Sequence, residues 1–257
     1  MKKNKLFAFL TAVTLSAVPA FMQAQDEVEA SVKADIVSRY MWRGFDKGGV
    51  SIQPQAKVNW QGLSLTAWGS TGLDKEDTQE IDLKLAYAKQ GFNVGLIDYW
   101  QTGIDTEDRY FYFSQADGAH KIEANVGYTC RWGSLQAYTT ILGQDKRPDG
   151  KRAYTTYIEG IVPFALGGID WQLRAGAVPF KSRGTRTQVF IPIIIEEAVN
   201  VDSYEYADGP ACVMASLRAT KTIQLTDNVA MPIFAEIHTN PYMQRANFLL
   251  GLSICPF

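Results

Sequence analysis

The chain has 257 residues, of which 46% are hydrophobic and 20% charged, with 25 Lys and Arg against 27 Asp and Glu. This near-neutral balance offers no basic surface for nucleic acid, and no apolar run after the N-terminus reaches the roughly eighteen residues of a transmembrane helix. The three cysteines, Cys130, Cys212 and Cys255, are far apart and form neither a disulfide framework nor a zinc pattern. We expect free, buried thiols, with one bridge as the alternative.

The first residues predict an exported protein. Three lysines within the first five residues precede an apolar run over 6–18, which has the length of a signal-peptide core and is too short for a membrane anchor. Small residues allow cleavage after Ala20 or Ala24, so we expect 1–24 to be removed and 25–257 to form the fold. Losing these three lysines from 25 basic residues leaves 22 against 27 acidic ones, a mature net charge of −5.

The beginning of the mature chain is typical of a β-hairpin with two unlike faces. Apolar and polar residues alternate over 32–43 and again over 50–60, which is the period of a β-strand. Each arm has about the ten residues that a tilted strand needs to cross a bilayer. The turn-rich segment 44–49 joins the arms, and Trp42 and Trp60 close the apolar faces as a membrane-interface girdle would.

The same pattern repeats along the chain and predicts twelve strands. After the two arms, strand-forming segments follow at 63–69, 80–89, 92–100, 120–128, 135–142, 154–164, 169–177, 212–221, 229–238 and 245–257. Every second connection is short, apart from the seven-residue link 222–228, and outer-membrane barrels show this asymmetry. We therefore predict an all-β fold, an antiparallel up-and-down transmembrane β-barrel of about twelve strands. Its closure leaves no strand edge unpaired in lipid.

The longest connection, 179–210, contains the apolar run Val189–Ile195. The alternation of short and long connections places it on the external side. It can fold into the mouth of the barrel or extend the flanking strands as a hairpin, and we favour the hairpin. In either case we expect it to be packed, because a loose apolar loop promotes aggregation.

The last predicted strand ends in Phe257. A terminal aromatic on an amphipathic strand resembles the signature of proteins inserted into the Gram-negative outer membrane, so the barrel-assembly machinery is an expected partner. The apolar parity of 250–254 is opposite to that of Phe257. We expect a bulge near Cys255 to restore the phase.

Three short motifs add a resemblance to a known family. They are SRYMWRG at 38–44, Gln53-Pro54, and Asn240-Pro241-Tyr242 before the last strand. Together they resemble a family of small porins from Gram-negative bacteria. The resemblance covers nearly the whole mature chain and implies a twelve-strand porin-type barrel in outer-membrane lipid, without catalytic residues.

Charged side chains on the polar strand faces are expected to point into one interior, which in twelve strands is wide enough for water. The pore-lining candidates are Lys33, Asp35, Arg39, Arg43, Lys57, Asp82, Lys84, Glu123, Arg174, Arg218 and Arg245. Both signs are represented, which predicts a weakly selective path. Arg39 and Arg43, four residues apart on one face, are the predicted constriction, with Asp35 and Asp82 as candidate opposites.

We predict a passive channel for small polar solutes. Two alternatives stay open: a closed-lumen barrel whose loops bind a partner, and an exported soluble β-barrel with a ligand inside. An enzyme is not expected, because His120 and His238 lack the serine spacing of barrel lipases and are typical of interfacial strand-end residues. The sequence indicates no cofactor, no metal site and no nucleic-acid partner.

Overall fold

The computed structural model describes residues 28–74, 77–104, 107–114, 118–190, 198–226 and 229–255. The predicted signal segment 1–24 and the terminal Phe257 lie outside the described residues, as does part of the apolar run Val189–Ile195. Within these ranges the chain forms no helix, and so none that is long and apolar enough to cross a membrane.

Twelve strands form the barrel. They are β1 (Glu29–Val37), β4 (Ser51–Trp60), β5 (Leu63–Gly72), β6 (Gln79–Lys89), β7 (Phe92–Gln101), β8 (His120–Cys130), β9 (Gly133–Gly143), β10 (Thr156–Leu166), β11 (Ile169–Val178), β14 (Ala211–Thr226), β15 (Val229–Asn240) and β16 (Arg245–Ile254). Two further pairs stand apart from that sheet: β2 (Tyr40–Trp42) with β3 (Phe45–Gly48), and β12 (Gly184–Phe190) with β13 (Ala198–Tyr204).

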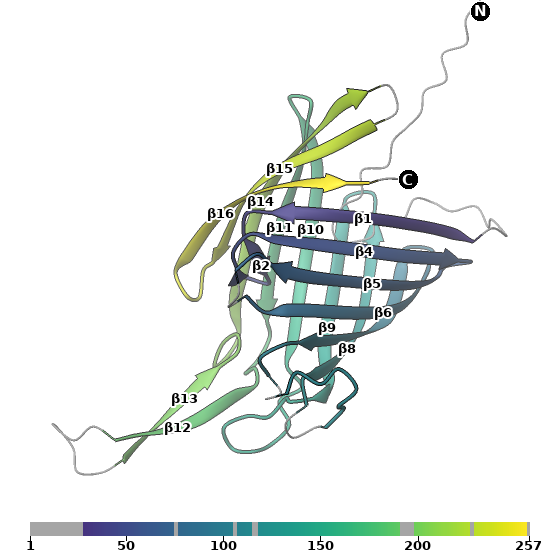
Figure 1. Cartoon of the computed structure of the whole chain (residues 1–257). Helices are drawn as coiled ribbons and strands as arrows, with labels where there is room; N and C mark the ends of the chain where they lie inside the picture. Colours follow the sequence, from purple (N-terminus) through teal and green to yellow (C-terminus); the bar gives the residue numbers. More distant parts are fainter. Residues whose placement is uncertain are drawn as a thin grey trace, which may run out of the picture.

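The barrel is closed in the order β1-β16-β15-β14-β11-β10-β9-β8-β7-β6-β5-β4, and every neighbouring pair that forms it is antiparallel (Figure 1). Strand β1 closes the ring, pairing with β4 along its whole length and with β16 over Ala34–Val37. The predicted all-β class, antiparallel order and number of barrel strands are confirmed.

The connections alternate between short turns and long loops, as predicted. Gln61 and Gly62 both have positive φ, 47° and 86°, and this two-residue geometry matches the right-handed twist of the strands it joins. The predicted seven-residue link at 222–228 is wrong, because β14 continues to Thr226, which pairs with Val229. That connection therefore follows the short-turn rule like the others at this end of the barrel.

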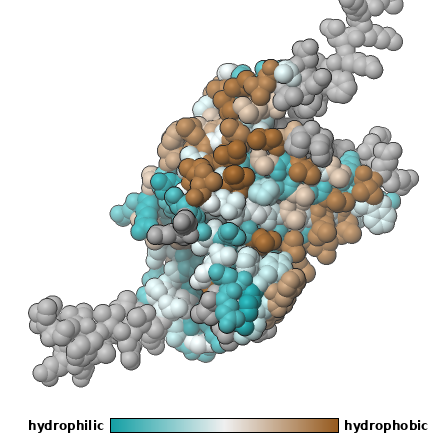
Figure 2. Space-filling model, viewed as in Figure 1, coloured by the Kyte–Doolittle hydropathy of each residue, from teal (hydrophilic) through white to brown (hydrophobic). Residues whose placement is uncertain are grey.

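The side chains of the wall are arranged with apolar residues outward and polar residues inward. Large apolar side chains exposed on the outside include Val58, Leu65, Leu85, Leu96, Val126, Leu173 and Leu250. Polar or charged side chains buried on the inside include Lys33, Asp35, Gln53, Thr66, Glu123, Asn125, Gln136, Glu159, Gln172 and Glu236. Figure 2 shows the hydrophobic colour gathered over the barrel strands. A water-soluble barrel has the opposite arrangement, since burying polar groups and exposing apolar ones both cost free energy in water.

Exposed aromatic residues gather at the short-turn end of the wall. They are Trp60, Tyr87, Phe92, Tyr128, Trp132 and Phe164. Some of them are packed in pairs: the ring centroids of Phe92 and Tyr128 lie 4.7 Å apart. This is the position of the interfacial aromatic girdle in membrane barrels.

The first predicted arm is too long, and this error matters for the site. Strand β1 ends at Val37, after which Ser38 exchanges hydrogen bonds with the backbone of Leu250 on β16. The chain then leaves the wall and forms the β2–β3 hairpin, which turns at Arg43 and Gly44 with φ of 47° and 91°. The predicted ladder of Arg39 and Arg43 on one strand face is therefore wrong.

The remaining local predictions are partly confirmed. The favoured hairpin in 179–210 is present: β12 and β13 pair from Gly184 with Tyr204 to Phe190 with Ala198, and they project beyond the barrel (Figure 1). The three cysteines are free, as expected, but they are exposed and not buried.

Candidate functional site

The β2–β3 hairpin crosses the barrel interior and brings Arg43 to the opposite wall. The guanidinium donates to both carboxylate oxygens of Glu123 on β8, from Nη1 to Oε1 at 3.0 Å and from Nη2 to Oε2 at 2.8 Å. Nη1 also donates to the hydroxyl of Tyr206 at 3.1 Å. Since β8 lies far around the ring from β1, this bidentate pair spans the lumen.

Aromatic rings enclose the same guanidinium. Its Cζ atom lies 4.6 Å from the ring centroid of Trp42, 4.5 Å from that of Tyr138 and 4.6 Å from that of Tyr157. Arg43 is only 7% exposed. A planar, weakly hydrated cation suits such a cage better than a lysine would.

The turn of the hairpin is also fixed to β14 and β15, which lie close to β1 around the ring. The amide of Gly44 donates to Nε2 of His238 at 3.0 Å, so Nδ1 carries the imidazole proton and donates to Glu236 Oε1 at 2.9 Å. Arg218 completes this series of hydrogen bonds by donating to Glu236 Oε2 at 2.6 Å. A Cβ atom on Gly44 would lie 1.9 Å from the carbonyl oxygen of Val213, so only glycine fits at this turn.

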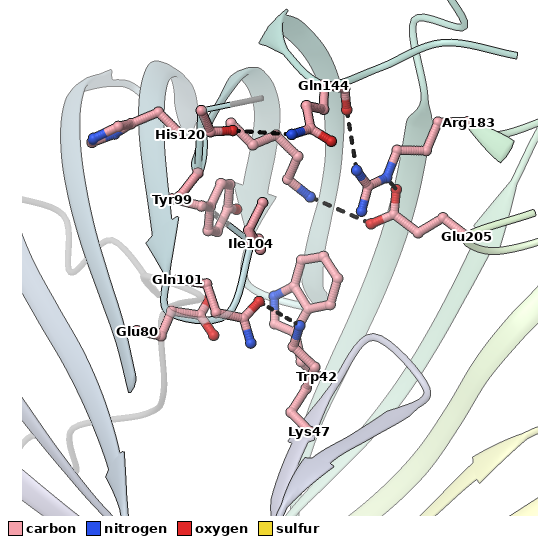
Figure 3. A pocket seen from close by; sticks show the side chains of 13 residues that line it. Trp42, Lys47, Glu80, Tyr99, Gln101, Ile104, His120, Gln144, Arg183 and Glu205 are labelled. Carbon is pink, nitrogen blue, oxygen red and sulfur yellow. Dashed lines mark hydrogen bonds and ion pairs between the residues drawn. The ribbon is translucent and has the colours of Figure 1, made fainter. Parts of the chain in front are cut away.

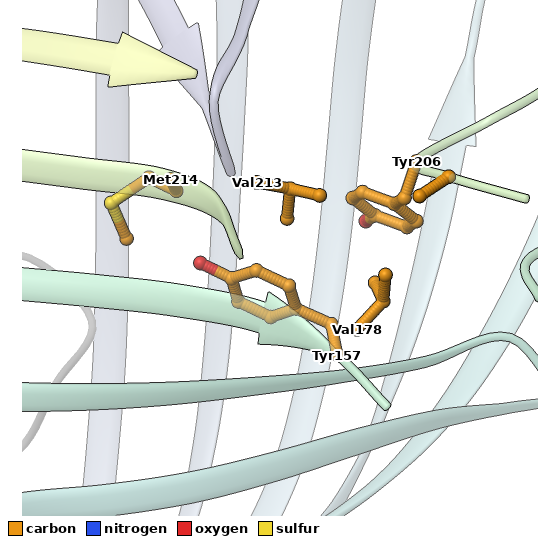
Figure 4. Close-up of a cluster of buried hydrophobic side chains, with 6 residues drawn as sticks. Tyr157, Val178, Tyr206, Val213 and Met214 are labelled. Atoms are coloured by element: carbon orange, nitrogen blue, oxygen red, sulfur yellow. The ribbon is translucent and has the colours of Figure 1, made fainter. Parts of the chain in front are cut away.

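An apolar cluster holds the hairpin in place. Its members are almost completely buried: Tyr157, Val178, Tyr206, Ala207, Val213 and Met214 (Figure 4). Trp42 and Phe45 of the hairpin pack against it. The cluster therefore fastens both the hairpin and the segment after β13 to the inner side of β10, β11 and β14.

A row of alternating charges leads from Arg43 toward the long-loop end of the barrel. Lys121 lies 3.5 Å from Glu123 and 3.5 Å from Glu205, and Arg183 donates to Glu205 at 2.6 Å. Burial alone would raise the pKa of the Glu205 carboxyl, but Lys121 and Arg183 together hold it below its usual range. Glu205 in turn holds the pKa of Arg183 above its usual value against the opposing effect of burial.

A cavity opens above the hairpin at this end (Figure 3). It contains about 520 Å³ of empty space, its open mouth included. Its lining combines aromatic and charged side chains, among them Trp42, Lys47, Glu80, Tyr99, Lys121, Arg183 and Glu205. Lys47 donates to Gln101 Oε1 at 3.0 Å, and Tyr40 donates to Glu80 Oε2 at 3.0 Å. This polar vestibule therefore lies between the long-loop end of the barrel and the Arg43–Glu123 pair.

Most of the predicted lining residues face the interior, and many are neutralised there. Those on the inner face of strands are Lys33, Asp35, Lys57, Asp82, Lys84, Glu123, Arg174 and Arg218. Internal ion pairs join Lys33 to Asp35 at 2.9 Å, Arg174 to Glu159 at 2.8 Å, and Arg218 to Glu236.

Three of the predicted roles differ from what the structure shows. Arg39 bonds to Asp46 within the hairpin and is partly exposed, so it does not stand beside Arg43. Arg245 lies exposed at the start of β16, at the rim. The carboxylate that faces Arg43 is that of Glu123, which we predicted to line the pore but did not pair with Arg43. The two carboxylates predicted to oppose it do not: Asp35 pairs with Lys33, and Asp82 forms no ion pair with any described residue.

Sequence reasoning also missed residues that hold the site together. The sequence pattern gives these residues no special role, because their partners are remote in sequence. They are Tyr138, Tyr157, Tyr206 and His238. His238 is not interfacial but points inward and is 2% exposed. His120 is buried between Asp98 and Phe113 of the loop that joins β7 to β8. The available signal was the concentration of aromatic and arginine side chains in 38–44, which is unusual for a simple external turn.

Among the described residues, no group of three or more His, Cys, Asp or Glu side chains is arranged to hold a metal ion. No protein-family model matches the chain, and no curated protein is similar to it.

Proposed function

We propose that this protein is an outer-membrane β-barrel that acts as a passive channel for small polar solutes, narrowed by the β2–β3 hairpin. The observation that carries the proposal is the sidedness of the wall, with exposed apolar residues outside and buried charged residues inside. An apolar exterior requires lipid around it, and a polar interior suits water and polar solutes. The aromatic girdle at the short-turn end supports the same placement.

The number of strands in the barrel means that the hairpin determines how wide the lumen is. Eight strands enclose a space that side chains fill, and barrels of about sixteen or more leave an open aqueous channel. Twelve strands lie between these limits, so a segment folded inside decides how much of the lumen stays open. The hairpin therefore takes the role of the constriction that we assigned to Arg39 and Arg43 together. Outer-membrane lipid and the barrel-assembly machinery are the proposed partners, and no enzymatic role is proposed.

Planar-bilayer recording on the refolded mature chain tests the channel. We expect small, steady unit currents with weak selectivity. A protein that folds, migrates differently with and without heating, and yet passes no ions would favour the closed-lumen barrel, which the packing around Arg43 also supports. A chain that stays folded and monodisperse in plain buffer would refute the membrane placement itself.

The outward face gives an independent test of the membrane placement. Leu85, paired with Leu96, is 49% exposed between the aromatic girdle and the external loops. We expect Leu85→Arg to lower the free energy of unfolding in phospholipid vesicles by about 2–4 kcal/mol, because it places a cation near the middle of the bilayer. Urea titration followed by tryptophan fluorescence measures this change.

The matched control is Leu166→Arg. Leu166 is also exposed and outward, but it ends β10 beside a short turn, where the same substitution is expected to cost about 0–1 kcal/mol. Equal costs at the two positions would contradict a bilayer around the strands.

A further inference from the structure

We infer that Lys57 and Lys84 form a binding site for an oxyanion of the phosphate type on the lumen wall beside the constriction. The inference names the solute class of the proposed channel and so rests on that function. The site is made by three neighbouring strands: Lys57 on β4 is in register with Thr66 on β5, and Thr66 is in register with Lys84 on β6.

The three side chains face the interior together. Val58, Leu83 and Leu85, their chain neighbours, are exposed on the outside, and alternate residues of a strand point to opposite faces. Thr66 itself is only 6% exposed. Two strand spacings of about 4.8 Å separate the two lysine backbones, so their long side chains can converge on one ligand above the Thr66 hydroxyl.

The two lysines differ from the other basic residues inside the barrel. Ion pairs to carboxylates neutralise Lys33, Arg43, Lys121, Arg174 and Arg218. Within the described ranges, neither Lys57 nor Lys84 makes a hydrogen bond or an ion pair. Lys57 and the buried Arg43 both place positive charge near the Lys84 ammonium. Two like charges in a partly buried wall repel each other, and a bound anion would relieve this repulsion.

The acidic residue closest along the chain does not remove this excess of positive charge. Asp82 lies two residues before Lys84 on the same face of β6, yet no ion pair joins them. The lysine pair stands in the register row that continues through Ile97 to Glu123, whose carboxylate is already occupied by Arg43. An anion passing the constriction therefore meets two uncompensated ammonium groups and a hydroxyl donor, which suits phosphate.

Isothermal titration of the refolded full-length mature chain in detergent with inorganic phosphate tests the site. We expect the wild type to bind, and the double variant Lys57→Gln/Lys84→Gln to bind at least ten-fold more weakly. Lys89→Gln is the matched control, since Lys89 ends the same strand in an exposed position and its loss should leave binding unchanged. Absence of binding by the wild type, or equal binding by the double variant, would overturn the site.

Two further arms separate this inference from the channel proposal and identify the ligand source. In a bilayer with a KCl gradient, the reversal potential should show anion preference in the wild type and the Lys89→Gln control, and lose it in the double variant. If the wild type binds phosphate, the double variant does not, and the wild type passes no current, then the binding site is supported and the channel proposal is refuted. Parallel titration with glycerol 3-phosphate identifies the source of the phosphate group. Tighter binding than that of inorganic phosphate indicates a phosphorylated solute, and weaker binding indicates free phosphate.

Discussion

Replacing residues 39–48 by a short Gly-Ser linker is expected to raise the single-channel conductance several-fold. These residues form the β2–β3 hairpin, which carries Arg43 across the lumen to Glu123. The wall should survive the change, because backbone bonds hold the chain on either side of the deletion. Ser38 bonds to Leu250, and the carbonyl of Val50 accepts from the amide of Leu73.

The β12–β13 hairpin supplies the control for this deletion. It belongs to a separate two-stranded sheet and projects away from the barrel, so trimming residues 187–201 should leave the unit conductance unchanged (Figure 1). Heat-modifiable migration on gels verifies that both deletion variants fold. If removing residues 39–48 from a folded barrel left the current as it was, the hairpin would not be the constriction.

The barrel itself was predictable because its determinants are local. Alternation of side chains marks each strand, and a pair such as Gln61 and Gly62 marks a tight turn. A two-residue turn also fixes the register of the strands it joins, so the pairing of Lys57 with Thr66 follows from the sequence. The pairing of Thr66 with Lys84 does not, because a longer loop connects β5 to β6 and leaves their register open.

The inward hairpin was not predictable from the same rules. Tyr40 and Trp42 continue the alternation of β1 because they too lie in a strand, so the pattern shows no break where the chain leaves the wall. What redirects the chain is contact with residues remote in sequence: Arg43 meets Glu123 eighty positions later, and Gly44 meets His238 after 194. Such contacts exist only once the barrel has closed.

The second large effect concerns the buried pair at the constriction. Arg43→Gln is expected to lower the free energy of unfolding by about 3–5 kcal/mol, because it leaves the Glu123 carboxylate, 1% exposed, without its bidentate partner. Glu123→Gln should cost less than Arg43→Gln, since the aromatic cage around the guanidinium and its bond to Tyr206 remain. Urea titration in phospholipid vesicles measures each variant.

The double variant Arg43→Gln/Glu123→Gln separates the pair from its surroundings. Two neutral amides can bond to each other, so we expect the double variant to be clearly more stable than Arg43→Gln alone, which is the non-additivity of directly coupled residues. Arg39→Gln is the control: the Arg39–Asp46 pair is 42% and 35% exposed, and removing such a pair typically changes stability by less than about 1 kcal/mol. Strictly additive costs for Arg43→Gln and Glu123→Gln would mean that the two groups do not stabilise each other. In that case the hairpin would be held in the lumen by its apolar cluster and by the Gly44–His238 bond, and the cross-lumen ion pair would contribute charge to the solute path but not rigidity.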